Sequence, residues 1–488
     1  MAARLPLLHK TPFVLDDRLL LEATSPHAGL LGVSRAYRSL GLPALVEANL
    51  CLRKRQRGFA EAQFIESILL LQIVGGECPE DLHLLANDDC LERGLGYAPP
   101  KATAVREFLE RFHDPALEPQ RPDRAVQKSF IFPASAEVAA LQTVQSGLVR
   151  RIAKLYEVQG QPQHIATIDQ DATIIESHKE AAYCHYEDGR GYQPMVAVWA
   201  EADLVLADEF RDGNVPARQA PLGCAQLAFA ALPTTIKERY FRGDSACHEN
   251  ELLAWLNHPD RAQEPGGRIG FAVSAMLTAP LATALRQVPE ADWQTFGQEA
   301  DGTLRQWAEV AFVPGTKYEQ KDRRPLRYVG LRLLKPQGVL FGDGSDRHFH
   351  AVVTNLALAG DRLLDWHREK AGTVEHTHDE VKNELGGGHV PSQRFGVNAA
   401  WFKCSLLAYN VVSAMKGLCL AGDERTARLK RFRLLLIQVA GRMNRNNCVM
   451  GLRLCNNRAA LQRLQKVWQV FALPTQATSA QPLKRRGG

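Results

Sequence analysis

The sequence predicts an α/β protein: a mixed sheet flanked by helices, interrupted by a β-rich insertion. Three observations support this prediction. Apolar residues recur at helical spacing up to about residue 160, short strand-like runs alternate with helical ones from 161 onward, and β-type runs dominate 278–355. The 488 residues are 45% hydrophobic and 23% charged, which is ordinary for globular proteins and argues against a disordered or fibrous chain.

The N-terminal region, residues 1–160, is expected to be all-helical. In Val105–Phe112 the apolar side chains follow the i, i+3, i+4, i+7 pattern of an amphipathic helix, and Thr103 is a suitable N-cap. The runs 59–76 and 141–160 show a similar pattern, and each ends at glycine, a common helix stop. The pattern of each helix by itself favours core packing over a direct functional role.

The period changes to that of strands in residues 161–277. Ile165–Ile175 alternates over its first half, and further strand-like runs follow at 195–200, 204–210, 238–245 and 269–275. Helical runs at 222–232 and 249–256 lie between them, which is typical of an α/β sheet. Strands at 307–314, 326–334 and 348–356 mark the insertion, residues 278–355. Helices return in 356–424 and are expected to continue through 425–488.

Three acidic residues lie at positions where α/β proteins often have catalytic or metal-binding side chains. Asp171 lies near the end of the first strand, Asp244 follows a later strand, and Glu375 lies in a helix that begins near Thr373. Side chains at strand ends and on a helix crossing the sheet can converge, and converging carboxylates bind hard cations such as Mg²⁺. Taken singly, an acid at such a position is more often structural than catalytic, and it is the shared arrangement on two strands and a helix that favours a site.

Alternation does not choose between Asp169 and Asp171, which share a face about 6.6 Å apart. Asp171 lies closer to the carboxyl end of the strand, where open α/β sheets bind ligands. Asp169 is expected to accept hydrogen bonds from nearby backbone or from Arg242.

The spacing of Glu375, Asp379 and Lys382 (i, i+4, i+7) puts these residues on one helical face. Lys382 could hold a DNA phosphate near a metal bound by Glu375. An ordinary surface ion pair between Asp379 and Lys382 is the alternative.

The formal net charge of +5 conceals a strong polarity along the chain. From Arg425 to Gly488 there are fourteen Lys or Arg and no Asp or Glu, so the remainder, with 45 basic and 54 acidic residues, carries −9. Such a segment attracts polyanions, of which nucleic acid is the most plausible. A solvated basic helix without a partner is the other interpretation.

In order, these landmarks resemble those of bacterial insertion-sequence transposases of the DDE type, over roughly residues 15–470. Asp171-Ala172-Thr173 resembles the family's D-x-T, Phe210–Asn214 its Leu/Phe-R-x-G-N element, and Arg242-Gly243-Asp244 its R-x-D. Glu375 and Lys382 fit the second half of its Y-(2)-R-(3)-E-(6)-K signature. The first half departs, since Arg368 and Ala371 stand at the Tyr and Arg positions and Lys370 is adjacent.

The resemblance implies an RNase H-like catalytic domain formed by 161–277 and 356–424, with a DNA-binding helical region at 1–160. It implies that Asp171, Asp244 and Glu375 bind two Mg²⁺ or Mn²⁺ ions and catalyse cleavage of element ends and joining of the 3′-hydroxyl to target DNA. The residues expected to contact DNA are Lys382, Arg211, Asn214, Lys370, Arg442 and Arg445. A nuclease without strand transfer, or an inactive DNA-binding derivative, are the alternatives. The expected partners are double-stranded terminal inverted repeats and target DNA, bound by a homodimer in the bacterial cytoplasm and nucleoid.

Other signals are weaker or absent. His348 and His350 would share a strand face and could bind zinc, whereas His376 and His378 point about 200° apart on a helix. Trp293 and Trp307 of the insertion could stack on a DNA base, although packing in its core is the simpler role. The ten cysteines include no C-x-x-C pair, and no Gly-rich phosphate loop, membrane span or signal peptide is recognisable, so neither a nucleotide nor a membrane is expected as a partner.

Overall fold

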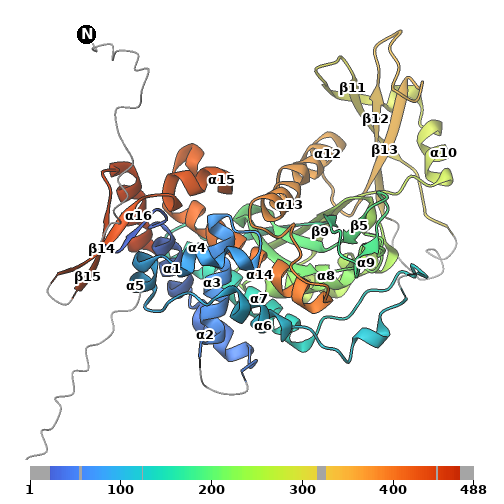
Figure 1. Cartoon of the computed structure of the whole chain (residues 1–488). Helices are drawn as coiled ribbons and strands as arrows, with labels where there is room; N and C mark the ends of the chain where they lie inside the picture. Colours follow the sequence, from blue (N-terminus) through green and yellow to red (C-terminus); the bar gives the residue numbers. More distant parts are fainter. Residues whose placement is uncertain (1–21, 54–57, 124, 316–325, 447–448, 473–488) are drawn as a thin grey trace, which may run out of the picture.

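The computed structural model describes residues 22–53, 58–123, 125–315, 326–446 and 449–472. Its largest sheet is mixed and has nine strands, in the order β10-β11-β12-β13-β9-β8-β2-β6-β7. The strands β11–β13 stand away from the helical body, at the upper right of Figure 1. The α/β class predicted from the sequence is therefore correct. In chain order the strands are β2 (Ile165–Ala172), β6 (Met195–Trp199), β7 (Leu204–Glu209), β8 (Glu238–Gly243), β9 (Ile269–Ser274), β10 (Gln294–Gln298), β11 (Leu304–Val310), β12 (Arg327–Leu334) and β13 (Arg347–Thr354).

Strand β2 lies inside the sheet, between one antiparallel and one parallel neighbour. β6 pairs with it antiparallel and forms a hairpin with β7, while β8 and then β9 follow in parallel. Residues 166–170 of β2 are all buried, as expected for a strand covered on both faces. Because β2 and β8 run in the same direction, their carboxyl ends meet at one edge of the sheet.

The insertion extends this sheet. Its strands β10–β13 form an antiparallel ribbon, and β13 pairs with β9, for example Val353 with Val273. The insertion also begins with a helix, α10 (Ala279–Gln287), which the β-rich interpretation of this stretch missed. Trp293 is buried beneath the ribbon.

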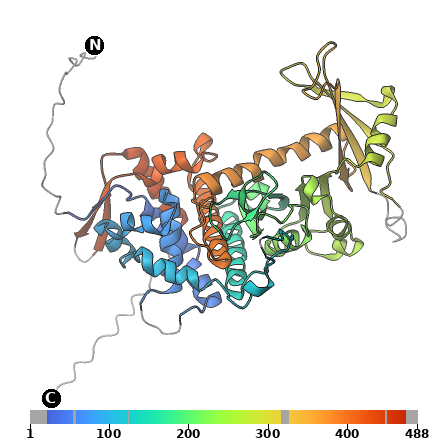
Figure 2. The ribbon, with the colours of Figure 1, turned by 45° about the vertical axis from the view of Figure 1, so that its right-hand side comes forward.

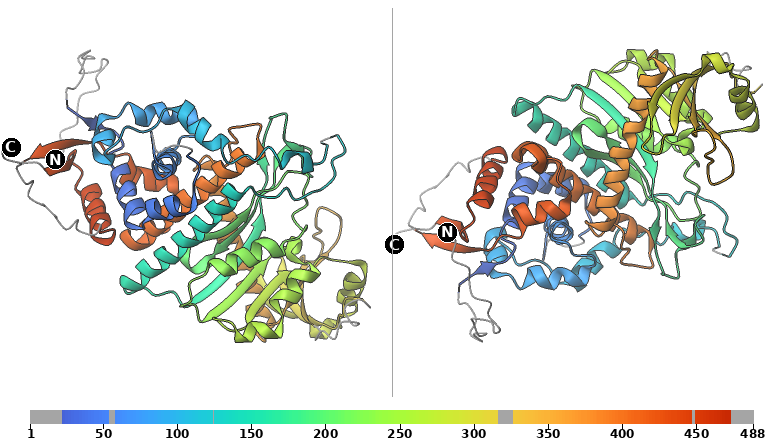
Figure 3. Two further views of the ribbon diagram at one scale, coloured as in Figure 1. Left: turned by 90° about the horizontal axis from the view of Figure 1, so that it is seen from below. Right: turned by 90° about the horizontal axis from the view of Figure 1, so that it is seen from above.

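Helices from both ends of the chain pack into one body. Helix α1 packs on α16, and both α3 and α7 pack on α14, so segments from the two ends of the chain lie side by side (Figure 3). One hydrophobic core accordingly includes residues as far apart in sequence as Leu30 and Phe471. Two of the expected helices are α3 and α7, and α3 stops at Gly75, whose φ of +109° is left-handed. Helix α6 begins at Ala102, so Thr103 is inside it and is not its N-cap. The helices are α1 (Leu30–Ser39), α2 (Leu42–Asn49), α3 (Glu61–Val74), α4 (His83–Ala86), α5 (Asp89–Leu95), α6 (Ala102–Glu110), α7 (Ala136–Val158), α14 (Phe395–Cys419) and α16 (Arg458–Val470).

The helices around the sheet come from its connecting segments. α8 (Leu222–Ala231) packs on β6 and β7, and α9 (Asn250–Leu256) on β9. After the insertion, α12 (Gly360–Arg368) packs on β9 and β11, and α13 (Val374–Asn383) on β2 and β6. Figure 2 shows α12 and α13 running one after the other from the insertion to the helical body. A small separate sheet is formed by β3 (Ile175–Glu176), β4 (Tyr183–Cys184) and β5 (Arg190–Tyr192).

The C-terminal segment corrects the expectation that 425–488 is helical. It begins with α15 (Leu429–Phe432) and a π-helical turn, η9 (Arg433–Ile437), but continues as a hairpin of β14 (Gly441–Asn446) and β15 (Val449–Leu454). A short strand, β1 (Thr24–Ser25), pairs with β14. The alternation Leu452-Arg453-Leu454 has the period of a strand, which the high density of basic residues obscured. In the part of the chain that the structure describes, no helix has the length and apolar character needed to cross a membrane.

Candidate active site

Two of the three candidate acids are brought together by the strand register. In the parallel pair of β2 and β8, Gln170 lies opposite Gly243, so the next residues, Asp171 and Asp244, stand side by side where the two strands end. Asp244 also accepts a hydrogen bond of 3.0 Å from the N–H of Ala246, which orients its carboxylate at the start of a short turn. Two carboxylates therefore share the carboxyl edge of the sheet.

Their proximity is visible in the electrostatics of the site. Burial, reinforced by the negative charge of Asp171, raises the pKa of Asp244. The turn between α12 and α13 brings a positive charge to the two strands. Nζ of Lys370 in this turn is 3.0 Å from Oδ2 of Asp171. Burial opposes the charge of Lys370, but the attraction of Asp171 and Asp244 outweighs it and raises the pKa of this lysine.

Glu375 reaches the same place from a different element. It is the second residue of α13, its side chain is exposed, and it lines a cavity of about 650 Å³ together with Asp244 and Lys370. Asp171 does not line this cavity, but it accepts a hydrogen bond from Lys370, which does. Among the described residues, no three Asp, Glu, His or Cys side chains are close enough together to enclose a metal ion. The expected convergence is therefore seen for the pair of aspartates, while Glu375 is only a neighbour.

The insertion forms the opposite wall of this cavity. Arg305 from β11, Leu331 from β12 and His350 from β13 line it, and so does His367 from α12. Burial lowers the pKa of His367 to about 4, so this ring is neutral at pH 7, with Nε2 placed 3.1 Å from the carbonyl oxygen of Gly243. Of these side chains the sequence singled out only His350, as half of a possible zinc pair, because they become neighbours only when the insertion joins β9.

Asp169 lies within β2, two residues before Asp171, and is fully buried inside the sheet. Its two carboxylate oxygens accept hydrogen bonds from Nε and Nη2 of Arg242 at 2.7 and 2.8 Å, and a further one from the hydroxyl of Thr373. The contact expected between Asp169 and Arg242 is therefore present. Arg242 also bonds to the carbonyl of Trp366, so this pair links β2 and β8 to the junction that carries Lys370.

Lys382 lies on the side of α13 that faces the end of β2. Its Nζ donates to the carbonyl oxygen of Ile174 at 3.1 Å. Asp379 pairs with Arg428 rather than with Lys382, so the surface ion pair considered as an alternative is not formed. Lys382 is half-buried, two turns along the helix from Glu375.

Arg211 does not have the exposure that a DNA contact requires. Its side chain is fully buried, pairs with Glu209 at 2.7 Å and donates to the carbonyl oxygens of Gln219 and Ala220. The expectation that Arg211 binds DNA is therefore corrected to a structural role at the end of β7. Asn214 is half-buried and donates to the carbonyl of Lys128 at 3.0 Å. Lys370 likewise faces Asp171 instead of solvent.

Several cations of the basic segment have acidic partners elsewhere in the chain. Arg442 pairs with Glu22, Arg463 with Glu424, and Arg428 with Glu384. The side chain of Arg445 and residues 473–488 lie outside what the structure describes. Acids elsewhere in the chain thus neutralise part of the basic segment. The positive charge that this segment offers to a polyanion is smaller than +14.

The histidine and tryptophan candidates have structural contacts. His348 stacks on Phe341 and contacts Asp343 at 3.1 Å, while His376 contacts Glu380 at 3.5 Å. Trp293 is buried, with the guanidinium of Arg332 over its ring, and Trp307 packs against Gly360 at the start of α12. Trp293 thus has the core position that the simpler interpretation expects, while Trp307 is half-buried against the small cluster of Ala272, Val329 and Leu363.

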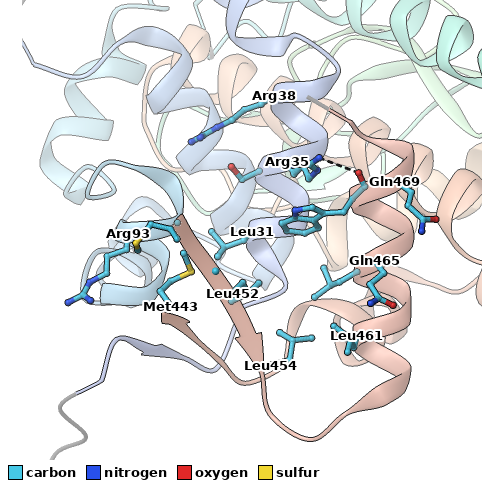
Figure 4. Close-up of a pocket in the computed structure, with 16 residues that line it drawn as sticks. Leu31, Arg35, Arg38, Arg93, Met443, Leu452, Leu454, Leu461, Gln465 and Gln469 are labelled. Atoms are coloured by element: carbon cyan, nitrogen blue, oxygen red, sulfur yellow. Dashed lines mark hydrogen bonds between the residues drawn. The ribbon is translucent and has the colours of Figure 1, made fainter. Parts of the chain in front are cut away.

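A second, mostly apolar groove of about 750 Å³ lies between α1, α16 and the β14–β15 hairpin (Figure 4). Its lining includes Leu31, Leu452 and Leu464, and the guanidinium of Arg35 lies over the ring of Trp468. None of the three candidate acids lines it, so it is separate from the acidic edge.

Comparison with known proteins identifies the class. The family model described as transposase DDE domain group 1 matches residues 22–474, nearly the whole chain. The chain therefore belongs to the DDE transposases of this group. Among solved structures it is similar to piggyBac transposase in a synaptic complex with hairpin DNA, with a TM-score of 0.37 and 10% identity over 83% of this chain and 81% of that one. No curated protein matches the chain.

Proposed function

We propose that this protein is the transposase of an insertion sequence, which cleaves the DNA at the ends of its element and joins the freed 3′-hydroxyl to target DNA. The observation that carries this proposal is the placement of Asp171 and Asp244 side by side at the carboxyl ends of adjacent parallel strands. Membership of the DDE family supports the same assignment. Glu375, on the cavity shared with Asp244, is the proposed third acid.

We further propose an RNase H-like catalytic core. The strand order β7-β6-β2-β8-β9 supports it, with an antiparallel β6–β7 hairpin on one side of β2 and parallel strands on the other. The helix that carries Glu375 packs on β2 and β6, next to the two aspartates. In this arrangement the four-stranded insertion enters the chain between the second aspartate and the glutamate.

The donor set suits Mg²⁺ or Mn²⁺, since Asp171, Asp244 and Glu375 offer only carboxylate oxygens and these hard cations prefer oxygen. Two such ions would stabilise the attacking and leaving oxygens of an in-line displacement at phosphorus. Lys370 holds Asp171 in place and balances its charge. Lys382 is placed near the end of β2, where a lysine can hold a DNA phosphate as a point charge.

The proposed partners are the terminal inverted repeats and the target DNA, bound by a homodimer in the bacterial cytoplasm. Arg442 and Arg445 are the proposed contacts of the β14–β15 hairpin, and Asn214 of the loop after β7. Contacts to phosphates would make binding strongly dependent on salt, because each neutralised phosphate releases counterions.

A gel assay with labelled terminal repeats and Mg²⁺ tests the proposal. Joined products are expected for a transposase. Cut DNA without joined products would instead indicate a nuclease, and shifted but intact DNA would indicate a DNA-binding derivative without catalysis. Short inverted repeats found in the DNA that flanks the gene would themselves support the proposal and would supply the substrate for this assay.

A further inference from the structure

The helix that carries Glu375 has a second acidic side, which binds the C-terminal segment. Glu380 is five residues beyond Glu375 and therefore about 140° around the helix. Glu380 is buried, and Glu384 at the end of α13 is nearly so, whereas the side chain of Glu375 is exposed. The two sides of α13 thus have different surroundings: the cavity on one side and protein on the other.

Both buried carboxylates cap the start of α15. The N–H of Leu429 donates to Oε1 of Glu380 at 2.7 Å, and the N–H of Lys430 donates to Oε2 of Glu384 at 2.5 Å. The first N–H groups of a helix lack intrahelical partners and attract negative charge. Helix α13 therefore supplies the capping groups that α15 does not have in its own sequence.

Arg428 connects the same two helices through its side chain. Its Nε donates to Oε1 of Glu384 at 2.8 Å, and its Nη2 pairs with Asp379. One guanidinium thus bridges two carboxylates that are five residues apart on α13. A lysine has no planar fork with which to hold both.

Arg433 joins the end of α13 to the helical body. Its guanidinium donates to the carbonyl oxygen of Glu384 at the end of α13, and to those of Ile73 at 2.6 Å and Gln72 at 3.2 Å in the last turn of α3. The last carbonyls of a helix have no intrahelical donors, so one half-buried arginine satisfies groups of two helices at once. This contact fixes where α13 ends relative to the N-terminal helices.

We propose that Arg428, Arg433 and the N–H groups of Leu429 and Lys430, here called the α13 clamp, position Glu375 for metal binding and DNA cleavage. Arg428 and Arg433 are then positioning residues, although their place in the basic segment suggests contacts to DNA. A ten-residue helix is not stable alone and takes its position from its tertiary contacts. A shift of about 1 Å in a catalytic group can reduce a rate by as much as about 100-fold. The inference rests on the proposed role of Glu375.

Arg428→Ala tests the clamp, with Lys430→Ala as the matched control. The control removes one positive charge two residues away but keeps the backbone N–H that Glu384 accepts. We expect Arg428→Ala to weaken Mn²⁺ binding, measured by calorimetry on the full chain without DNA, several-fold relative to the control. Single-turnover cleavage of prebound end DNA should slow by about 10- to 100-fold, while the DNA dissociation constants of the two variants stay equal. Equal Mn²⁺ affinities and cleavage rates in the two variants would overturn the proposal.

Glu384→Gln removes the other half of the contact and guards against an unfolded variant. If the pair acts as a unit, the double variant Arg428→Ala/Glu384→Gln will cleave no more slowly than either single variant. Arg428→Lys should recover only part of the rate. Fully additive losses in the double variant, with unchanged circular dichroism, would contradict a shared positioning role.

Failure of this inference is distinguishable from failure of the proposed function. If the unmodified protein does not cut end DNA, the proposed function fails whatever the clamp does. If it cuts and Glu375→Gln abolishes cutting, but Arg428→Ala matches Lys430→Ala, only the clamp is wrong.

Discussion

The aspartates and the glutamate of the candidate site are held by different kinds of contact. Asp171 and Asp244 follow adjacent parallel strands, so backbone hydrogen bonds of the sheet fix their relative position. Glu375 stands on a short helix, α13, that packs on β2 and β6 through side chains and is also bonded at its far side and end to residues 428–433. The aspartate pair should therefore tolerate changes around it better than the glutamate does. Substitutions of the two aspartates and of the residues around them can test this contrast.

The largest effect is expected at Asp171. Asp171→Asn keeps the size of the side chain but removes the charge, and we expect Mg²⁺-dependent cleavage to fall by about 10³-fold or more, as for other groups that act as part of a catalytic unit. Binding of end DNA should be unchanged in a gel-shift assay. Cleavage at more than a tenth of the original rate would remove Asp171 from the site.

Asp169→Asn should act mainly on stability, two residues away on the same strand. The buried guanidinium of Arg242 would lose its buried charged partner and keep only the exposed carboxylate of Glu369, and breaking a buried pair typically costs about 3–5 kcal/mol. Urea unfolding measures this loss. A variant as stable as the parent but unable to cleave would reverse the roles assigned to the two aspartates.

Asp244→Asn should abolish cleavage but stabilise the fold. The folded protein raises the pKa of Asp244, so the charged carboxylate is less favourable in the fold than in the unfolded chain. This destabilisation is complete above the folded pKa and disappears as the pH falls to the ordinary pKa of aspartate, about 3.9. We expect Asn to add about 0.5–2 kcal/mol at pH 8, as is common when active-site strain is relieved.

Thermal unfolding of Asp244→Asn and the parent at pH 8 and near pH 4 measures the effect. The difference should shrink at the lower pH. A variant that is less stable than the parent at pH 8 would contradict the unfavourable charge at this edge.

The smallest effect is expected at Arg442. Because Arg442 already pairs with Glu22, Arg442→Glu should reduce the salt dependence of end binding by no more than about one phosphate contact, but measurably. Binding measured from 50 to 200 mM salt gives the slope. A loss of several contacts would mean that the Glu22 pair opens on DNA, while an unchanged slope would remove Arg442 from the DNA surface.

The sequence was informative where local pattern decides structure. A strand ending at an acid could be recognised from alternation, and the helix of Glu375 from its spacing, so the elements carrying Asp171, Asp244 and Glu375 were placed correctly. The contact of Asp169 with Arg242 followed from strand position as well.

The sequence was misleading where partners lie far apart in the chain. The acids that neutralise Arg428, Arg442 and Arg463 lie outside the segment counted from Arg425, so charge counting overestimated its free charge. Arg211 matches a family element but is fully buried beside Glu209, which motif spacing does not reveal. The hairpin at 441–454 was hidden because its three arginines, Arg442, Arg445 and Arg453, were counted with the basic residues of the C-terminal segment. The insertion's contribution to the cavity depends on the pairing of β13 with β9, which no local pattern encodes.

Metal rescue of cysteine variants tests most directly whether Asp171 and Asp244 bind the catalytic metal. A thiolate is a poor ligand for Mg²⁺, while a softer transition-metal ion such as Mn²⁺ accepts it better. Asp171→Cys and Asp244→Cys should each fail to cleave end DNA in Mg²⁺ and recover cleavage in Mn²⁺, while Asp169→Cys should show no such dependence on the metal. Rescue at Asp169→Cys instead of Asp171→Cys, or full cleavage by Asp171→Cys in Mg²⁺, would contradict this account.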